Sequence, residues 1–396
     1  MGEFASMEDE EFKRYKTVRQ WVNYLSNKGT EQSYLTKLKR FCDWIGKDPD
    51  TLIDERFKHL RSEDIRENHE HEELITAFLK KMESSLSPYS LASYAGAIRS
   101  FYRYNRADLK LLKSIRVYGV RREKVPTREE VAKMCQVSST RDRAIILFQY
   151  QSGLRNDTIA KLQYGDVKED LEKGQVPVRI HIMPEQTKCR IEYDTFIGRD
   201  AIDALNASLD ERKRGVAVRG ARPEEITDES PLFRSGRGVG RVEPITSHTI
   251  AKLTVRAAVR AGVVERSKSK RGERKGYTPL HAHCLRKAFQ TTLEASGVSS
   301  NWVKYMMGHK LPGVEGAYSK PSVKQLREAY AKAEPSLSIS ETKPVLTSEE
   351  IEELVNRRVE ERLRTLLPED RLRALEERLE FVEKLKREHP KWVSEK

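Results

Sequence analysis

The spacing of apolar residues constrains the fold of this chain more than any other feature. Between residues 11 and 105 they recur every three or four positions, as in "YKTVRQWVNYL", and no segment there alternates as a strand would. Later in the chain, apolar helical segments surround two alternating ones, "VPVRIHI" and "RIEYDTF", which "MPEQTKC" joins as a hairpin. The sequence therefore predicts a mainly α fold with one small antiparallel sheet, in the α+β class.

Changes of pattern divide the chain into five parts. Residues 1–6, "MGEFAS", are typical of an expression remnant before a start at Met7 and are left out of the fold prediction. A helical domain is predicted over 7–112, a basic linker over 113–126, and a second domain over 127–335, opened by a capping box. Residues 336–396 are predicted to form a charged helical extension, either a solvated tail or an oligomerisation element.

The charge of the chain indicates an anionic partner. It has 74 Lys and Arg against 61 Asp and Glu, a net charge of +13, and chains this basic commonly meet nucleic acid or anionic surfaces. Arg121, Arg122 and Lys124 in the linker suit phosphate contacts. The four cysteines have no CxxC spacing, which favours the reducing cytoplasm. No apolar run is long enough for a membrane span, so no membrane partner is expected.

One segment, "TPLHAHCLRKAFQTTLEASG", combines cationic and titratable side chains. It places His283 and Arg286 three positions apart, on one face of a predicted helix. A cation beside a titratable ring suits an anion, most naturally a phosphate. The alternative is a zinc site made of His281, His283, Cys284 and His309. Because Arg286 would repel a metal cation there, the phosphate interpretation is favoured.

A phosphoryl-transfer site without a metal needs a nucleophile, cations around the phosphate oxygens and an acid for the leaving group. The chain offers such groups, within "SGLRND", "EQTKCR", "HCLR" and "MMGHKLPGVEGAYSK", in the order Arg155, Lys188, His283, Arg286, His309 and Tyr318. This ordered set resembles the tyrosine recombinases of the phage-integrase type, over residues 11–335. The high charge and the "AYSK" context are similar to integrases of archaeal viruses or plasmids.

The resemblance implies a function: site-specific DNA recombination or integration by strand cleavage and rejoining. It implies a helical DNA-binding domain at the N-terminus, followed by a catalytic domain. Tyr318 would attack a phosphodiester and form a 3′-phosphotyrosyl intermediate. Arg155 and Arg286 would hold the non-bridging oxygens, for which a planar guanidinium is well suited.

Three further residues complete the site that the resemblance implies. Lys188 would be the general acid for the 5′-hydroxyl, His283 would take the tyrosine proton or orient the phosphate, and His309 would bond a phosphate oxygen. Because the phosphotyrosine keeps the energy of the broken bond, no cofactor, metal or ATP is expected. The remaining close histidine pair, His69 and His71, lies in a Glu-rich stretch and is expected to be solvated.

The implied partner is double-stranded DNA, enclosed by a clamp of the two domains. The resemblance implies a homotetramer on synapsed DNA sites, and a monomer or weak dimer in the absence of DNA. Two alternatives stay open. A type IB topoisomerase-like enzyme would share the chemistry but relax supercoils, and a non-catalytic architectural protein would bind DNA without forming a covalent adduct.

The chain departs from the family pattern at one position. Thr158 stands three residues after Arg155, where the family often has an acidic residue. This departure concerns a contact that would support Arg155, and the expected role of Arg155 itself is unchanged. Asp166 matches a position that is usually a structural aspartate. Tyr305 and Tyr330 are rival nucleophiles, but Tyr318 alone follows the Gly-His pair at the family's spacing.

Overall fold

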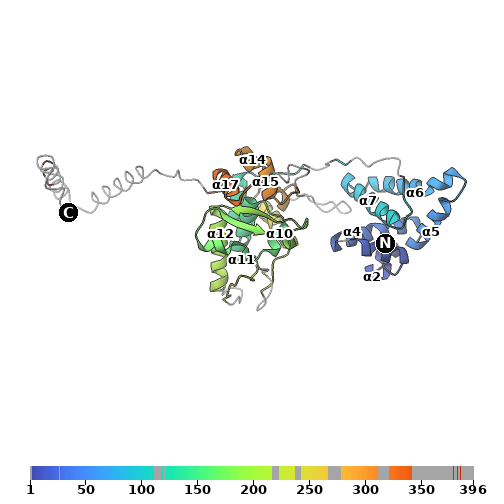
Figure 1. Cartoon of the computed structure of the whole chain (residues 1–396), viewed down its shortest axis with the longest axis horizontal. Helices are drawn as coiled ribbons and strands as arrows, with labels where there is room; N and C mark the ends of the chain where they lie inside the picture. The colour runs from blue at the N-terminus through green and yellow to red at the C-terminus, as the bar shows by residue number, and fades with distance from the viewer. Residues whose placement is uncertain are drawn as a thin grey trace. The chain divides into compact units, whose positions relative to one another are not determined.

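The structure is a computed structural model that describes residues 2–25, 27–110, 117–118, 122–215, 223–236, 242–265, 278–310, 321–340, 378, 381 and 384. Two compact units divide at Arg122 and Glu123, and each is described by itself (Figure 1). Helices dominate both units, and the strands of the described residues form one two-stranded sheet. The mainly α prediction with a small antiparallel sheet is confirmed.

The first unit is entirely helical in its described part. Its helices bury their apolar faces in one aromatic core that includes Trp21, Phe41 and Phe101, none of them exposed. The bounds are α1 (Glu3–Ser6), α2 (Asp9–Phe12), α3 (Lys16–Tyr24), α4 (Lys28–Ile45), α5 (Pro49–His59), α6 (Ile65–Glu83) and α7 (Pro88–Tyr104).

Residues 3–6, which are typical of an expression remnant in the sequence, are part of this fold. They form α1, and Phe4 is buried in the aromatic core. The backbone N–H groups of Phe4 and Ala5 donate to the carboxylate of Asp43 at 2.7 and 2.9 Å. A carboxylate on α4 thereby satisfies donors at the start of α1.

His71 is buried, which corrects the expectation of a solvated histidine pair; His69 is exposed. The Nδ1 atom of His71 lies 2.9 Å from the hydroxyl of Tyr102. Burial, followed by the charge of Arg56, lowers the pKa of His71 to about 4. The ring is therefore neutral at ordinary pH and belongs to the core.

A buried ion pair holds the end of the first unit. Arg56 and Glu72 pair at 2.7 Å, with side chains 2% and 5% exposed. Arg56 also donates to the carbonyl of Asp108 at 2.9 Å, and Glu72 accepts from the backbone N–H of Lys110 at 3.0 Å. These bonds satisfy the buried charges and fasten the backbone that follows α7.

The second unit is built around one helix, α9 (Thr140–Ser152). Every residue of α9 from Ala144 to Ser152 is buried, as expected for a helix covered on all sides, and it packs against α8, α12, α14 and β2. The other elements are α8 (Arg128–Gln136), α10 (Asn156–Lys161), α11 (Gly165–Glu172), β1 (Val178–Ile182), η1 (Pro184–Gln186), β2 (Tyr193–Ile197), α12 (Arg199–Arg214), α13 (Ser247–Arg260), α14 (Ala282–Ala295), α15 (Ser300–Met306) and α17 (Val323–Leu337).

The predicted hairpin and capping box are both present. Strands β1 and β2 pair antiparallel, with Val178 opposite Ile197 and Ile182 opposite Tyr193. At the start of α8, the hydroxyl of Thr127 accepts from the N–H of Glu130 at 3.3 Å, and the Glu130 carboxylate accepts in return at 3.1 Å.

Helix α17 passes through the boundary expected at residue 335. Pro335 lies inside the helix, and Leu337 in its last turn is fully buried in the second unit. Of the extension predicted over 336–396, residues 341–396 lie outside the described residues, except 378, 381 and 384. In the described part of the chain, no helix is both long and apolar enough to span a bilayer.

Candidate active site

Helix α14 brings two of the predicted residues to one face. His281 is its N-cap residue, His283 follows in the first turn, and Arg286 lies three positions later. His283 is exposed, whereas Arg286 is 1% exposed. Because the first turn of a helix presents free N–H groups and the positive end of the dipole, an anion is favoured there.

The guanidinium of Arg286 joins three segments of the second unit. Its Nη1 donates to the carbonyl of Gly153, and its Nη2 donates to the carbonyl of Met307 at 2.6 Å and to Nε2 of His309 at 2.8 Å. Burial, followed by the charge of Arg155, lowers the pKa of Arg286 to about 10. The side chain remains cationic near neutral pH and is held rigidly.

Gly153 creates the turn that exposes one of these carbonyls. It ends α9 in the left-handed region, with φ of 63°. A Cβ atom at this position would lie 2.4 Å from Cδ1 of Phe289. Only glycine combines this backbone angle with this close approach. Arg155 follows two residues after this turn.

Arg155 and Arg286 lie near one another without an acidic partner. Arg155 occupies the N-cap position of α10, is half-buried, and donates from Nη1 to the carbonyl of Gly308 at 3.4 Å. Among the described residues, no carboxylate lies within ion-pair distance of either guanidinium. Two such charges in a partly buried site, without a counter-ion from the chain, favour the binding of an anion.

His309 completes this group as a neutral acceptor. Burial, followed by the charges of Arg286 and Arg155, lowers its pKa to about 4. Because a guanidinium only donates, the bond from Arg286 requires Nε2 of His309 to accept and places the ring proton on Nδ1. The backbone N–H of His309 donates to the carbonyl of Lys304 at 3.0 Å, which fixes the position after α15.

His283 is suited to accept a proton. Partial burial, followed by the charges of Arg286 and Lys287, lowers its pKa below the ordinary histidine value. The ring is therefore mainly neutral near pH 7 and can serve as a base.

Lys188 lies in the hairpin between β1 and β2, and Asp166 organises this segment. The Asp166 carboxylate accepts from the N–H of Gln163 and from the side-chain amide of Gln186, both at 2.8 Å. Gln186 in turn accepts from the N–H of Met183. Lys188 follows two residues later and is exposed, so its ammonium can approach a ligand from outside.

Two predicted residues lie outside the described part of the chain: Tyr318, the expected nucleophile, and Arg121. The cationic loop at 266–275 lies outside it as well. Of the two rival tyrosines, Tyr330 is fully buried, and its hydroxyl donates to the carbonyl of Gln151 at 2.8 Å. Burial raises the pKa of both Tyr330 and Tyr305, so both hydroxyls hold their protons more strongly than an exposed tyrosine does.

The linker residues fall into two kinds. Arg122 is exposed. The ammonium of Lys124 contacts Glu130 at 2.6 Å and the carbonyl of Val263 at 2.9 Å, and its N–H donates to the carbonyl of Pro279. These contacts anchor the linker to the second unit, and a phosphate contact of Lys124 stays a prediction.

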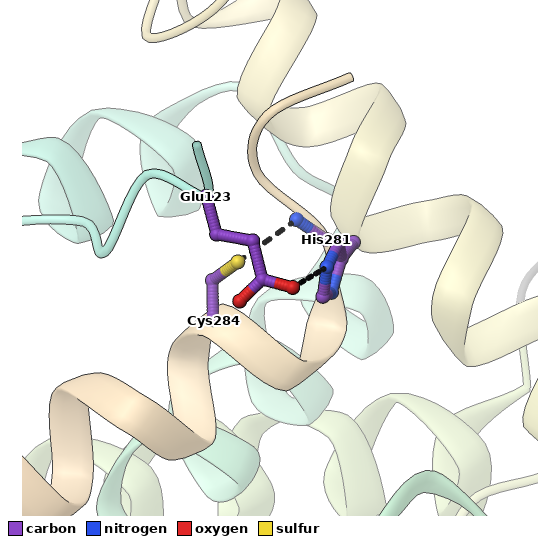
Figure 2. A group of neighbouring side chains, drawn as sticks. All are labelled: Glu123, His281 and Cys284. Atoms are coloured by element: carbon purple, nitrogen blue, oxygen red, sulfur yellow. Dashed lines mark hydrogen bonds and ion pairs between the residues drawn. The ribbon is translucent and has the colours of Figure 1, made fainter. Parts of the chain in front are cut away.

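The four residues of the zinc alternative are not brought together. Among the described residues, the ligand atoms that gather are those of Glu123, His281 and Cys284, within 4.8 Å of one another (Figure 2). Burial raises the pKa of the Cys284 thiol, and the Glu123 carboxylate is paired with Lys287. A neutral thiol and a neighbouring ammonium both oppose a divalent cation.

Tyr193 on β2 is a site residue that the sequence did not indicate. It is 1% exposed, and a Cβ atom at Gly308 would lie 2.4 Å from its Cε1 atom. Burial raises its pKa, while the charges of Arg286 and Arg155 and a contact with Thr158 oppose the rise. An aromatic residue in an alternating segment predicts only core packing, so the sequence carried no signal for this position.

The chain is similar to several known proteins. The model of the phage integrase family matches residues 124–324. The chain is 24% identical over 330 residues to tyrosine recombinase XerC of Leptospira interrogans, covering 81% of this chain and 93% of that protein. It is 28% identical over 262 residues to tyrosine recombinase XerA of Thermococcus kodakarensis, covering 65% and 79%. A lambda integrase tetramer bound to a Holliday junction matches at 15% identity with a TM-score of 0.49, covering 78% and 79%.

Proposed function

The chain belongs to the phage integrase family, whose model matches more than half of it, and is a tyrosine recombinase that acts in site-specific DNA recombination; on this premise we propose that strand cleavage takes place at the group formed by Arg155, Arg286 and His309. The observation that carries the proposal is the pair of arginines without a carboxylate from the described chain. A scissile phosphate supplies the missing negative charge, and the fixed guanidinium groups stabilise the charge that develops on it.

The other roles follow from the family resemblance and from the chemistry of the side chains. Tyr318 is the nucleophile and forms a 3′-phosphotyrosyl bond, while its proton passes to the neutral ring of His283. Lys188, on the exposed hairpin, donates a proton to the 5′-oxygen as it leaves. The bond to tyrosine conserves the energy of the phosphodiester, so a second 5′-hydroxyl reverses the step without ATP or a metal ion.

The proposed substrate is double-stranded DNA, in keeping with a net charge of +13. Recombination exchanges strands between two duplexes, so we propose that four protomers act on a pair of synapsed sites and that the free protein is a monomer or weak dimer. An origin in an archaeal virus or plasmid stays a prediction from the sequence.

A covalent adduct tests the cleavage proposal. A binding site is first selected from a pool of random duplexes and is then placed in a nicked duplex, from which the cleaved end diffuses away. We expect a protein–DNA adduct on denaturing gels in the presence of EDTA. Tyr318→Phe should bind this duplex as the wild type does and form no adduct. An adduct with the Phe variant would transfer the role to another tyrosine.

The two alternatives give different results with the same protein. A topoisomerase-like enzyme would relax a supercoiled plasmid that carries one site and would not exchange strands between two sites. An architectural protein would bind the selected duplex and form no adduct under any condition. Strand exchange between two sites, together with the adduct, would exclude both alternatives.

A further inference from the structure

Glu123, the first residue of the second unit, holds two cationic or titratable groups of α14. Its carboxylate lies 3.3 Å from Nε2 of His281 and forms an ion pair with the ammonium of Lys287 (Figure 2 shows Glu123 with His281). The bond from Lys287 lowers the pKa of the Glu123 carboxyl. The carboxylate is therefore ionised near neutral pH and occupies this position as an anion.

These groups adjoin the proposed cleavage site. Lys287 directly follows Arg286 and lies four residues after His283, so it shares a helix face with His283. The rings of His281 and His283 are stacked, with centroids 6.3 Å apart. An anion held by Lys287 and His281 is thus next to His283, the residue proposed to take the proton of the nucleophile.

The contact is exposed enough to exchange. The side chains of Glu123, His281 and Lys287 are 33%, 36% and 42% exposed, and ion pairs of this kind add little to stability. Glu123 also stands between Arg122 and Lys124, as a single acidic residue in a basic stretch. A carboxylate in such a stretch repels the phosphates of DNA and therefore weakens DNA binding.

We propose that Glu123 is an internal competitor of DNA. In the free chain its carboxylate occupies a phosphate position formed by Lys287 and His281, and a backbone phosphate beside the cleaved one displaces it. This inference rests on the proposed function of α14. It adds Lys287 and His281 as phosphate contacts and gives Glu123 a regulatory role: it weakens binding to DNA that cannot fill this position.

A double-mutant cycle on the full chain tests the competition. Binding of a fluorescent 30-base-pair duplex of random sequence is measured for the wild type, Glu123→Gln, Lys287→Gln and the double variant. We expect Glu123→Gln to bind about fivefold more tightly, the equivalent of one exposed ion pair. Lys287→Gln should bind more weakly, with a log–log salt slope reduced by about 0.9. In the Lys287→Gln background, the effect of Glu123→Gln should largely disappear.

The matched control is the exposed pair of Glu169, on α11, and Lys173, the residue that caps the end of this helix; the two contact at 2.7 Å. Glu169→Gln changes the net charge as Glu123→Gln does, and we expect no coupling between Glu169→Gln and Lys173→Gln in DNA binding. Equal effects of Glu123→Gln and Glu169→Gln would overturn the proposal, since net charge alone would then explain the gain. A gain of unchanged size in the Lys287→Gln background would overturn it as well.

Two further measurements separate this inference from a metal site at the same residues and from the proposed function. If zinc bound to the free protein, and Cys284→Ser abolished that binding, the three residues of Figure 2 would be a metal site, and the competitor role would be overturned. The adduct assay is run in parallel. Absence of an adduct with the wild type would contradict the proposed function, whereas absence of coupling in the binding cycle would contradict the role of Glu123 alone.

Discussion

Arg286 gives the sharpest prediction at the scale of a single residue. Arg286→Lys keeps the charge, but an ammonium cannot donate along the fork that reaches two carbonyls and His309. We expect single-turnover cleavage to fall by about 10²-fold or more, the usual cost of a lost donor at a developing anion. Arg179→Lys on β1, where the arginine pairs with Asp194, is the control. Near-normal cleavage by Arg286→Lys would remove the guanidinium geometry from the mechanism.

His309 gives a prediction about protonation. Its pKa of about 4 lies below the ordinary histidine value, so the neutral ring persists as pH falls from 7 to 5. In Arg286→Ala the pKa of His309 should rise, because both a neighbouring positive charge and a donor to Nε2 are removed. NMR of the imidazole nitrogens reports both the tautomer and the titration. A wild-type His309 ring that titrates near 6.5, or that carries its proton on Nε2, would contradict the hydrogen bond from Arg286 to Nε2 of His309.

Residue types and their order were sufficient to place Arg155, Arg286 and His309 in one site. The motif spacing reflects local geometry, such as two side chains three residues apart on a helix. Glu123 and Tyr193 could not be found in this way. Glu123 meets His281 across 158 positions of sequence, and no local pattern encodes such a contact. The contacts of Lys124 with Val263 and Pro279 could not be predicted for the same reason, since these partners are equally remote in the sequence.

At the scale of elements, the turn after α9 is the feature to test. Gly153→Ala should destabilise the chain by about 1–2 kcal/mol for the left-handed backbone, and by about 1–3 kcal/mol more for the collision with Phe289. Gly174 is the matched control, because its φ of 65° is similar but nothing lies within 4 Å of an added Cβ atom. Urea unfolding of the two variants isolates the packing contribution. Equal losses would mean that Phe289 moves aside freely.

The elements themselves were largely predictable from the sequence, because periodicity and end signals are local. The capping box of α8 and the hairpin are both present as predicted. The domain boundary predicted at residue 335 falls inside a helix, although proline lacks the N–H that continues a helix. Helix α17 nevertheless extends two residues further, because burial of Leu337 outweighs the loss of one hydrogen bond.

At the scale of the whole molecule, two truncations separate folding from assembly. A chain ending at Glu334 loses the buried Leu337 and should be less stable by about 2–5 kcal/mol, the range for deletion of a buried leucine side chain. A chain ending at Ser340 retains this contact, and we expect it to fold and to form the adduct on one site. If the remaining residues join protomers, it should fail to exchange strands between two sites. Full strand exchange by this shorter chain would exclude an essential role for 341–396.

The buried pair of Arg56 and Glu72 has a consequence for how tightly the two units can grip one duplex. It fastens the backbone as far as Lys110, and Lys124 fastens the other end of the connection. The chain from Lys110 to Lys124 has fourteen Cα–Cα steps and spans at most about 50 Å. Both anchors are held by bonds, so neither end of the connection lengthens it. If both units bind one duplex, as the sequence predicts, a connection of this length raises the effective concentration of the second unit once the first is bound. Two modest affinities then act together as one strong affinity, whose size depends on the length of the connection.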